Sequence, residues 1–289
     1  MTMTTTKIGL ATIQMTSVAE TAANLHEARR FIELAARQGA KLAVLPENFA
    51  FMAADEGARS AMAEVDGSGP IQDSLAAAAR ECGVWIVGGT IPLASAERER
   101  PFAACCVWDD QGRRVGRYDK IHLFDVRVPG SSEAYRESRR TMAGSTPLVI
   151  ATPFGNLGIA VCYDLRFPEL FRAMLDRSVN IIAVPAAFTQ RTGQAHWHTL
   201  LKARAIENLC YVVAAAQTGE HPGGRLTYGH SMIIGPWGEV LAEAAEGPGV
   251  VSATMDEDYL QRLRVQFPAL NHRRLPGPGL PVSNGMTVA

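Results

Sequence analysis

The first third of the chain alternates short apolar runs with apolar residues at helical spacing. Residues 8–14 form a short apolar run, which predicts a buried strand. The next apolar residues recur three or four positions apart, as on one face of a helix: Leu25, Ala28, Ile32 and Ala35. Ser17 and Glu20 have the spacing of a capping box before this helix, and Gly39 follows its last turn. Residues 41–45 are a second apolar run, so the pattern predicts a strand–helix–strand unit.

The same unit recurs further along the chain, with antiparallel hairpins between and after its copies. The predicted helices span residues 70–81, 168–177, 196–208 and 256–266. The predicted strands span residues 84–88, 157–161, 180–184, 211–216 and 250–255, and hairpins are predicted over 102–118 and 228–244. Residues 131–144 and 220–225 are polar or glycine-rich and predict loops. A mixed sheet, or two sheets covered by helices, therefore fits better than a purely parallel sheet.

Length and composition favour one α/β domain. The chain has 289 residues, of which 47% are hydrophobic, so it can bury a sizeable core. No internal stretch has the composition of a linker, which predicts a single domain over residues 1–274. From residue 275 the chain becomes rich in proline and glycine, and residues 275–289 are expected to form a tail.

Charge and cysteine usage exclude several classes of partner. The formal net charge is -1 and the two signs are interspersed, which favours neither nucleic acid nor an acidic membrane surface. The N-terminal residues lack the pattern of a secretion signal, and no apolar run approaches the roughly 20 residues that span a bilayer. Five cysteines without a Cys-x-x-Cys pair fit a reducing compartment. We therefore expect a cytoplasmic protein.

Cys162 occupies the turn between a predicted strand and a predicted helix. The strand covers residues 157–161, and Pro168 with Glu169 is typical of the start of a helix. At such a turn the helix dipole and unpaired N–H groups favour a thiolate, which is the nucleophilic form. A single cysteine is more often an inert core residue, so the position alone leaves both interpretations open. Cys105 and Cys106 lie on a predicted strand with side chains on opposite faces, which favours structural thiols.

Glu47 and Lys120 also follow predicted strands. Open α/β sheets bind ligands at the carboxyl ends of their strands, which is where Glu47 is expected. Catalytic cysteines usually use histidine as their base, but no histidine here has a diagnostic local pattern: His122, His196, His198, His221 and His230. A carboxylate can serve instead if burial raises its pKa toward neutrality, and an ammonium can stabilise a developing oxyanion. The alternative is that both residues are surface charges.

Three separated segments carry a family resemblance. Residues 46–48 (Pro-Glu-Asn), 117–126 (Arg-Tyr-Asp-Lys-Ile-His-Leu-Phe-Asp-Val) and 161–170 (Val-Cys-Tyr-Asp-Leu-Arg-Phe-Pro-Glu-Leu) resemble the three signatures of the nitrilase superfamily of carbon–nitrogen hydrolases. The resemblance extends from Ile8 to about Arg274. Further segments resemble the Nit-type amidase branch of that superfamily: 188–197, 202–207, 211–217 and 228–232.

The resemblance implies a fold, an assembly and a set of catalytic roles. It implies an αββα sandwich with two mixed β-sheets covered by helices, a homodimer, and an acyl-enzyme mechanism without metal or organic cofactor. Cys162 would be the nucleophile, and Glu47 the general base. Lys120 would hold the oxyanion together with the backbone N–H of Tyr163. A second glutamate belongs after the lysine motif, and Glu137 matches it one residue further on than expected.

Two further assignments follow from the same resemblance. Glu133 competes with Glu137 for the place of the second glutamate. The implied substrate is a small amide that carries a carboxylate, for which Arg166 offers a planar fork unless it forms a structural ion pair. Phe188 and Thr192 are weaker candidates for the pocket, with plain packing as the alternative.

The implied reaction leaves the substrate partly open. Residues 210–217 and 271–274 resemble the family members that act on deaminated glutathione more closely than the ω-amidases. This resemblance implies hydrolysis of deaminated glutathione to α-ketoglutarate and cysteinylglycine. The alternatives are an ω-amidase that acts on α-ketoglutaramate, and a catalytically silent partner-binding module. His196 and His198, two positions apart on a predicted helix, face different directions, which disfavours a shared metal. Trp197 is expected in the core or at a dimer interface.

Overall fold

A computed structural model describes residues 7–55, 57–130, 133–244 and 246–275, and its larger sheet has seven strands. The strand order is β17–β1–β2–β3–β5–β4, and β6 pairs with β5. Pairing is parallel from β1 through β3 and antiparallel elsewhere in this sheet. The strands are β1 (Lys7–Gln14), β2 (Ala40–Val44), β3 (Trp85–Val87), β4 (Ile91–Leu93), β5 (Phe102–Trp108), β6 (Arg114–Asp119) and β17 (Gly249–Asp256).

The second sheet has six strands in the order β16–β15–β12–β11–β10–β9. Pairing is parallel between β10, β11 and β12 and antiparallel at both flanks, so this sheet is mixed as well. The strands are β9 (Leu148–Thr152), β10 (Gly155–Ile159), β11 (Ile181–Ala186), β12 (Tyr211–Ala216), β15 (Met232–Ile234) and β16 (Val240–Glu243).

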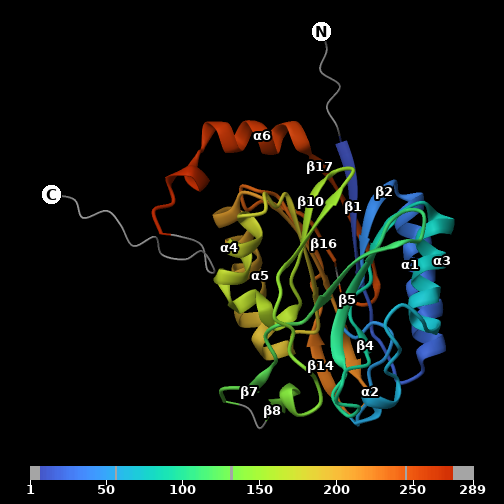
Figure 1. Ribbon diagram of the computed structural model, residues 1–289. Coiled ribbons are helices and arrows are strands. Elements are labelled where there is room, and N and C mark those ends of the chain that lie inside the picture. The colour runs from blue at the N-terminus through green and yellow to red at the C-terminus, as the bar shows by residue number, and fades with distance from the viewer. Residues whose placement is uncertain (1–6, 56, 131–132, 245, 276–289) are drawn as a thin grey trace.

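Helices cover the outer face of each sheet (Figure 1). Those of the seven-stranded sheet are α1 (Thr21–Arg37) and α3 (Pro70–Cys82), and those of the six-stranded sheet are α4 (Pro168–Leu175) and α5 (Gln190–Asn208). The inner faces of the two sheets pack on each other through β1 and β12. The four layers confirm the predicted αββα sandwich.

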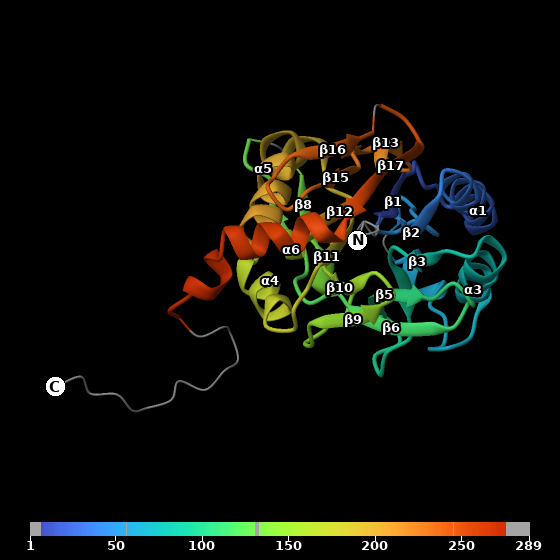
Figure 2. The same ribbon diagram turned by 90° about the horizontal axis from the view of Figure 1, so that it is seen from above.

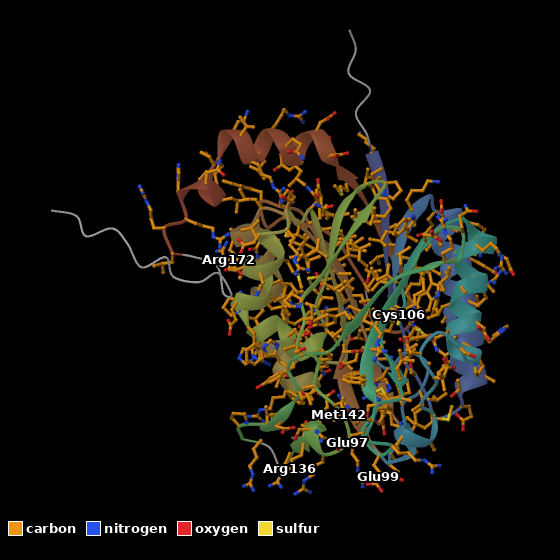
Figure 3. The ribbon with its side chains drawn as sticks, in the orientation of Figure 1. Glu97, Glu99, Cys106, Arg136, Met142 and Arg172 are labelled. Carbon is orange, nitrogen blue, oxygen red and sulfur yellow. The ribbon has the colours of Figure 1, made fainter. Side chains whose placement is uncertain are left out.

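Two hydrophobic clusters fill the spaces between these layers. One cluster joins both sheets with α4 and α5, and the other lies between the seven-stranded sheet and its helices. Cys105 and Cys106 are adjacent in β5, so their side chains point to opposite faces of the sheet. Cys105 therefore belongs to the first cluster and Cys106 to the second. Figure 3 shows Cys106 on the side of the sheet that faces α1 and α3. The prediction of one domain over residues 1–274 stays a prediction, which the core shared between the sheets supports.

Smaller elements gather at one end of the sandwich, where α2, β7, β8 and β14 lie together in Figure 1. Two ribbons pair there, β7 (Asp125–Arg127) with β8 (Ala134–Arg136) and β13 (Thr218–His221) with β14 (Arg225–Tyr228). The short helices at this end are α2 (Ala58–Ala61) and the 3₁₀ turns η1 (Glu137–Arg139) and η2 (Cys162–Arg166), whereas a third 3₁₀ turn, η3 (Ala269–His272), follows the last helix of the chain.

The opposite end is closed by α6 (Glu257–Gln266), which Figure 2 shows in front of the six-stranded sheet when the molecule is seen from above. Arg264 donates hydrogen bonds to the carbonyls of Leu209 and Val179 at 2.9 and 2.6 Å. Both carbonyls precede central parallel strands. Because α6 covers the strand N-termini, the strand C-termini are left to form a site at the other end.

Two local predictions about helix and strand ends were wrong. Ser17 does not cap α1, which has Glu20 at its N-cap and no side-chain cap. The Ser17 hydroxyl instead donates to the carbonyl of Phe49 at 2.8 Å. The strand predicted over residues 180–184 does not end there, because β11 continues through Pro185 to Ala186. The neighbouring β10 pairs only as far as Ala183, so the missing N–H of Pro185 interrupts no ladder on that side.

Two segments that were predicted as loops contain regular secondary structure. Within residues 131–144 lie β8 and η1, while residues 131–132 fall outside the described residues. The ends of the glycine-rich stretch 220–225 lie in β13 and β14, and residues 222–224 form the turn between them, with Gly223 and Gly224 at positive φ. Of the predicted tail 275–289 only Leu275 is described. No helix in the described part of the chain is both long and apolar enough to cross a membrane.

Candidate active site

Three strand ends bring Glu47, Lys120 and Cys162 together. Glu47 follows β2 after Leu45 and Pro46, Lys120 directly follows β6, and Cys162 opens η2 shortly after β10. All three residues are buried, with 4%, 1% and 8% of their surface exposed. The alternative of surface charges for Glu47 and Lys120 is therefore wrong.

The ammonium of Lys120 lies between two carboxylates. Its Nζ is 2.8 Å from Glu47 Oε1 and 2.8 Å from Glu137 Oε2. Glu137 Oε2 also accepts the backbone N–H of Phe124 at 2.7 Å, which fixes this carboxylate. Glu133 is exposed and accepts a hydrogen bond from Tyr135 at 2.8 Å. The structure thus brings Glu137, and not Glu133, to Lys120.

The charges of this cluster decide where protons reside. Burial and the negative charge of Glu47 raise the pKa of the Cys162 thiol well above its ordinary value, outweighing Lys120 and a backbone hydrogen bond from Ala187. Burial alone would raise the pKa of Glu47, but the charge and hydrogen bond of Lys120 and the hydrogen bond of the thiol lower it overall. For Lys120 the directions are reversed. Burial alone would lower its pKa, but the charges of Glu137 and Glu47 raise it overall.

Two expectations about protonation are corrected by this arrangement. The helix start was expected to favour a thiolate at Cys162, but the thiol is buried beside a negative charge and its pKa is raised. Burial was expected to move the pKa of Glu47 toward neutrality, but Lys120 lowers it. The resting site therefore holds a neutral thiol next to an ionised carboxylate, which can accept the thiol proton.

Cys162 lines the pocket from an unusual backbone position. Cys162 has φ 49°, a left-handed conformation that is uncommon for a residue with a side chain. Tyr163 is the second residue of η2, and the first N–H groups of a helix have no intrahelical acceptor. The Tyr163 N–H is thus not needed by the helix itself. As predicted, α4 begins at Pro168.

Asp164, whose role no sequence pattern indicated, connects the Cys162 turn to the segment of Lys120. This fully buried carboxylate accepts hydrogen bonds from the Tyr118 hydroxyl at 2.6 Å, the Val161 N–H at 2.9 Å and the His122 N–H at 3.0 Å. The ring of His122 approaches the same carboxylate at 2.7 Å. Because Tyr118 and His122 flank Lys120, Asp164 fixes the position of Lys120 relative to Cys162.

Gln217 holds Glu47 from the other sheet. Its Nε2 donates to the backbone carbonyl of Glu47 at 3.0 Å and to the Ser17 hydroxyl at 2.7 Å. Since Gln217 directly follows β12, the strand ends of both sheets are tied together at the site. The next residue, Asn48, has φ 57° and is held as well, because its backbone N–H donates to the Thr90 hydroxyl at 2.9 Å.

A pocket opens onto this cluster and contains every predicted binding residue. Arg166 lies 3.2 Å from the ring nitrogen of His196, and its guanidinium lies over the Phe188 ring at 5.4 Å. Phe188 is buried and packs on Trp197. The hydroxyl of Thr192 lies 2.9 Å from that of Thr189. The pocket is lined by Tyr163, Arg166, Phe188 and Thr192 together with Glu47, Lys120, Glu137 and Cys162.

The predicted alternatives for two of these residues are settled by the packing. Arg166 makes no ion pair with a carboxylate among the described residues, so no structural ion pair is found there. Trp197 is fully buried and donates its ring N–H to the His230 carbonyl at 2.8 Å, which makes it a core residue.

Three arginines of the pocket were missed from the sequence: Arg59, Arg140 and Arg225. Arg59 lies on α2 and Arg225 begins β14, and both line the pocket. Arg225 follows a pair of glycines and Arg59 lies in a polar stretch, which gave no sign that either residue reaches the site. Arg59 and Arg225 come from distant segments of the chain that contact each other, at Ala54 and Gly223.

A separate cluster contains the only three potential metal ligands that the described residues bring together: His198, His230 and Glu243. Glu243 Oε1 lies 2.9 Å from His198 Nε2 and 2.7 Å from His230 Nδ1. Two imidazole N–H groups can donate to this one oxygen, so the arrangement is complete as a hydrogen-bonded cluster. His196 points elsewhere, to Arg166, as its spacing from His198 predicts.

The geometry provides the parts of nucleophilic acyl transfer. A thiol stands beside an ionised carboxylate that can take its proton, and a buried ammonium can stabilise negative charge on a carbonyl oxygen. Arginines around the opening suit an anionic substrate.

The chain is similar to known proteins over nearly its whole length. The model of the family described as carbon–nitrogen hydrolase matches residues 9–265. The deaminated glutathione amidase of Synechocystis sp. (strain PCC 6803 / GT-S) is 45% identical over 267 residues, which cover 91% of this chain and 97% of that protein.

Two solved structures share the fold. The NitFhit protein of C. elegans superposes with a TM-score of 0.86 at 37% identity, covering 94% of this chain but only 66% of that longer chain. Saccharomyces cerevisiae Nit3, a member of branch 10 of the nitrilase superfamily, superposes with a TM-score of 0.83 at 30% identity. That match covers 93% of this chain and 97% of Nit3.

Proposed function

Because the chain belongs to the carbon–nitrogen hydrolase family, we propose that it hydrolyses deaminated glutathione to α-ketoglutarate and cysteinylglycine. The family makes it a hydrolase of non-peptide carbon–nitrogen bonds with a small-molecule substrate. The observation that carries the proposed mechanism is the Lys120 ammonium held between Glu47 and Glu137 beside the Cys162 thiol. The 45% identity to a deaminated glutathione amidase supports the substrate.

In the acylation half-reaction, Cys162 Sγ attacks the amide carbon while Glu47 takes the thiol proton. The carbonyl oxygen becomes an oxyanion, which Lys120 Nζ and the Tyr163 N–H stabilise. Glu47 then gives its proton to the amide nitrogen, the carbon–nitrogen bond breaks, and cysteinylglycine leaves. A thioester between Cys162 and the α-ketoglutaryl group remains.

In the deacylation half-reaction, Glu47 accepts a proton from water as the water oxygen attacks the thioester carbon. The second oxyanion forms at the same place and is stabilised by the same donors. Collapse of this intermediate breaks the carbon–sulfur bond, α-ketoglutarate leaves, and the proton on Glu47 returns to the sulfur. Glu137 holds Lys120 throughout, so the ammonium keeps its charge and its direction.

The substrate assignment predicts a preference between two related amides. We expect kcat/KM for deaminated glutathione to exceed that for α-ketoglutaramate by about 10-fold or more, because the larger substrate makes additional contacts in the transition state. The measurement is release of α-ketoglutarate from each compound, with Cys162→Ala as the blank. A preference for α-ketoglutaramate would make the chain an ω-amidase, and activity on neither would leave the family chemistry but remove this substrate.

We propose that two copies of the chain associate through an exposed apolar patch. Trp237 and Phe267 are 53% and 48% exposed, and their rings contact each other with centroids 5.1 Å apart. Ile206, 48% exposed, lies directly against the same turn at Gly238. Adjoining exposed apolar side chains are typical of an interaction surface.

Sedimentation velocity tests this proposal. The wild-type protein should sediment as a dimer, and Trp237→Ser should weaken the dimer. A monomeric wild type would contradict the proposal.

The cytoplasmic location stays a prediction. All five cysteines are free in the structure, which supports a reducing compartment.

A further inference from the structure

The pocket around Cys162 has an excess of positive charge. Five cationic side chains line it, against three carboxylates. Lys120 is neutralised by Glu47 and Glu137, so that Asp55 is the only other carboxylate of the lining. The remaining cations make no ion pair with any residue that the structure describes: Arg59, Arg140, Arg166 and Arg225.

Two of these arginines also have buried donors without a partner. Arg59 Nη2 and Arg225 Nε are buried, and neither has a hydrogen-bond acceptor in the described part of the chain. The rest of Arg225 is held in place, since its Nη2 donates to the Ala187 carbonyl at 3.1 Å and its guanidinium lies over the Tyr135 ring at 5.4 Å. A buried charged donor without an acceptor is unfavourable, and an anion in the pocket would satisfy it.

Arg59 and Arg225 come from segments that touch each other. Gly223, in the β13–β14 turn before Arg225, lies so near Ala54 that an added Cβ would be 2.9 Å from the Ala54 side chain. Ala54 precedes the helix α2 that carries Arg59. Arg166 belongs to another segment, since it shares the short helix η2 with Cys162. Arg59 and Arg225 thus come from two segments that contact each other, and Arg166 comes from the segment of the nucleophile. Arginines supplied by both parts of the pocket suit a ligand with two anionic ends.

We propose that Arg59 and Arg225 form a second carboxylate-binding subsite, which holds the glycine carboxylate of the leaving half of deaminated glutathione. This assignment rests on the proposed function. Arg166, on the helix of the nucleophile, is placed for the carboxylate of the acyl half, which stays on Cys162 as the thioester. The guanidinium fork matches a carboxylate in shape and charge. The subsite selects amides with a second carboxylate over α-ketoglutaramate, which has one.

The experiment compares three substrates: deaminated glutathione, its analogue with a glycine carboxamide, and α-ketoglutaramate. Arg59→Met and Arg225→Met are expected to lower kcat/KM for deaminated glutathione by about 10- to 100-fold, mainly through KM. For the wild-type enzyme, kcat/KM should be lower on the carboxamide analogue than on deaminated glutathione by a similar factor. On that analogue and on α-ketoglutaramate, kcat/KM of the variants should be close to the wild-type value, because neither compound carries the glycine carboxylate.

Two controls separate binding from structure. Arg139→Met, which removes an exposed charge outside the pocket, should leave all three values unchanged, and Arg59→Lys should restore part of the loss. An equal loss on all three substrates, or no loss on deaminated glutathione, would overturn the subsite. A wild-type enzyme that hydrolyses α-ketoglutaramate but not deaminated glutathione would instead overturn the proposed substrate, and this assignment with it.

Discussion

Replacing Cys162 with alanine is expected to lower amide hydrolysis by at least about 10³-fold, because no other group of the site can form the thioester. The charged groups beside the thiol are Glu47 and Lys120, which already contact each other at 2.8 Å. Cys162→Ser should be nearly as inactive, since a hydroxyl is a weaker nucleophile than a thiol. The measurement is α-ketoglutarate release under substrate saturation, so that a change in KM does not hide the loss of kcat.

The control for this variant is a measurement of thermal stability, which shows whether Cys162→Ala is folded. Alanine removes one buried atom at a residue with φ 49° and 8% exposure, so the thermal midpoint should shift by only a few degrees. Mass spectrometry after treatment with a thiol-directed electrophile should show an adduct on Cys162 in the wild type. Substantial activity in folded Cys162→Ala protein would remove the acyl-enzyme mechanism while leaving the family assignment intact.

The elements of the fold were largely predictable because their signals are local. The apolar run 211–216 became β12, and the proline and glycine that bound residues 70–83 mark the start and end of α3. Residues 222–224 of the predicted loop 220–225 do form a turn, but its two ends belong to the paired strands β13 and β14, which were not predicted. Strand pairing is a tertiary property that glycine content alone does not report.

The site was predictable only where a motif marked it. Glu47, Lys120 and Cys162 stand in recognisable segments, whereas Arg59 and Arg225 reach the pocket only because their segments pack against each other. The protonation of Cys162 was predicted in the wrong direction for a related reason. A helix start acts over one turn, but the burial and the charge of Glu47 that raise the thiol pKa arise from the packing of distant strand ends.

Lys120→Met is expected to have the second largest effect, because it removes both the oxyanion donor and the counter-charge of two carboxylates. Lys120 is 1% exposed and its ammonium contacts Glu47 and Glu137. Removing one partner from a buried ionic cluster typically costs about 3–5 kcal/mol of unfolding free energy at neutral pH. Activity should fall below detection, and urea unfolding should show the loss of stability directly.

The pH dependence of that loss identifies its cause. In the wild type the pKa of Glu47 is lowered, so its contribution to stability is present above the unfolded pKa and is lost as pH falls through the folded pKa. Without Lys120, burial is the dominant influence and should raise the pKa of Glu47 above its unfolded value. The variant should then lose stability as pH rises through this new folded pKa, so the deficit should be larger at about pH 8 than at about pH 5.

A double variant tests whether the unpaired charge of Glu47 is responsible. Lys120→Met combined with Glu47→Gln replaces a buried carboxylate by a neutral amide of similar shape, so it should recover part of the lost stability and flatten the pH dependence. Activity should stay absent, because both the base and the oxyanion donor are gone. A deficit that is the same at both pH values, and unchanged in the double variant, would mean that Lys120 stabilises the fold through packing of its carbon chain and not through its charge.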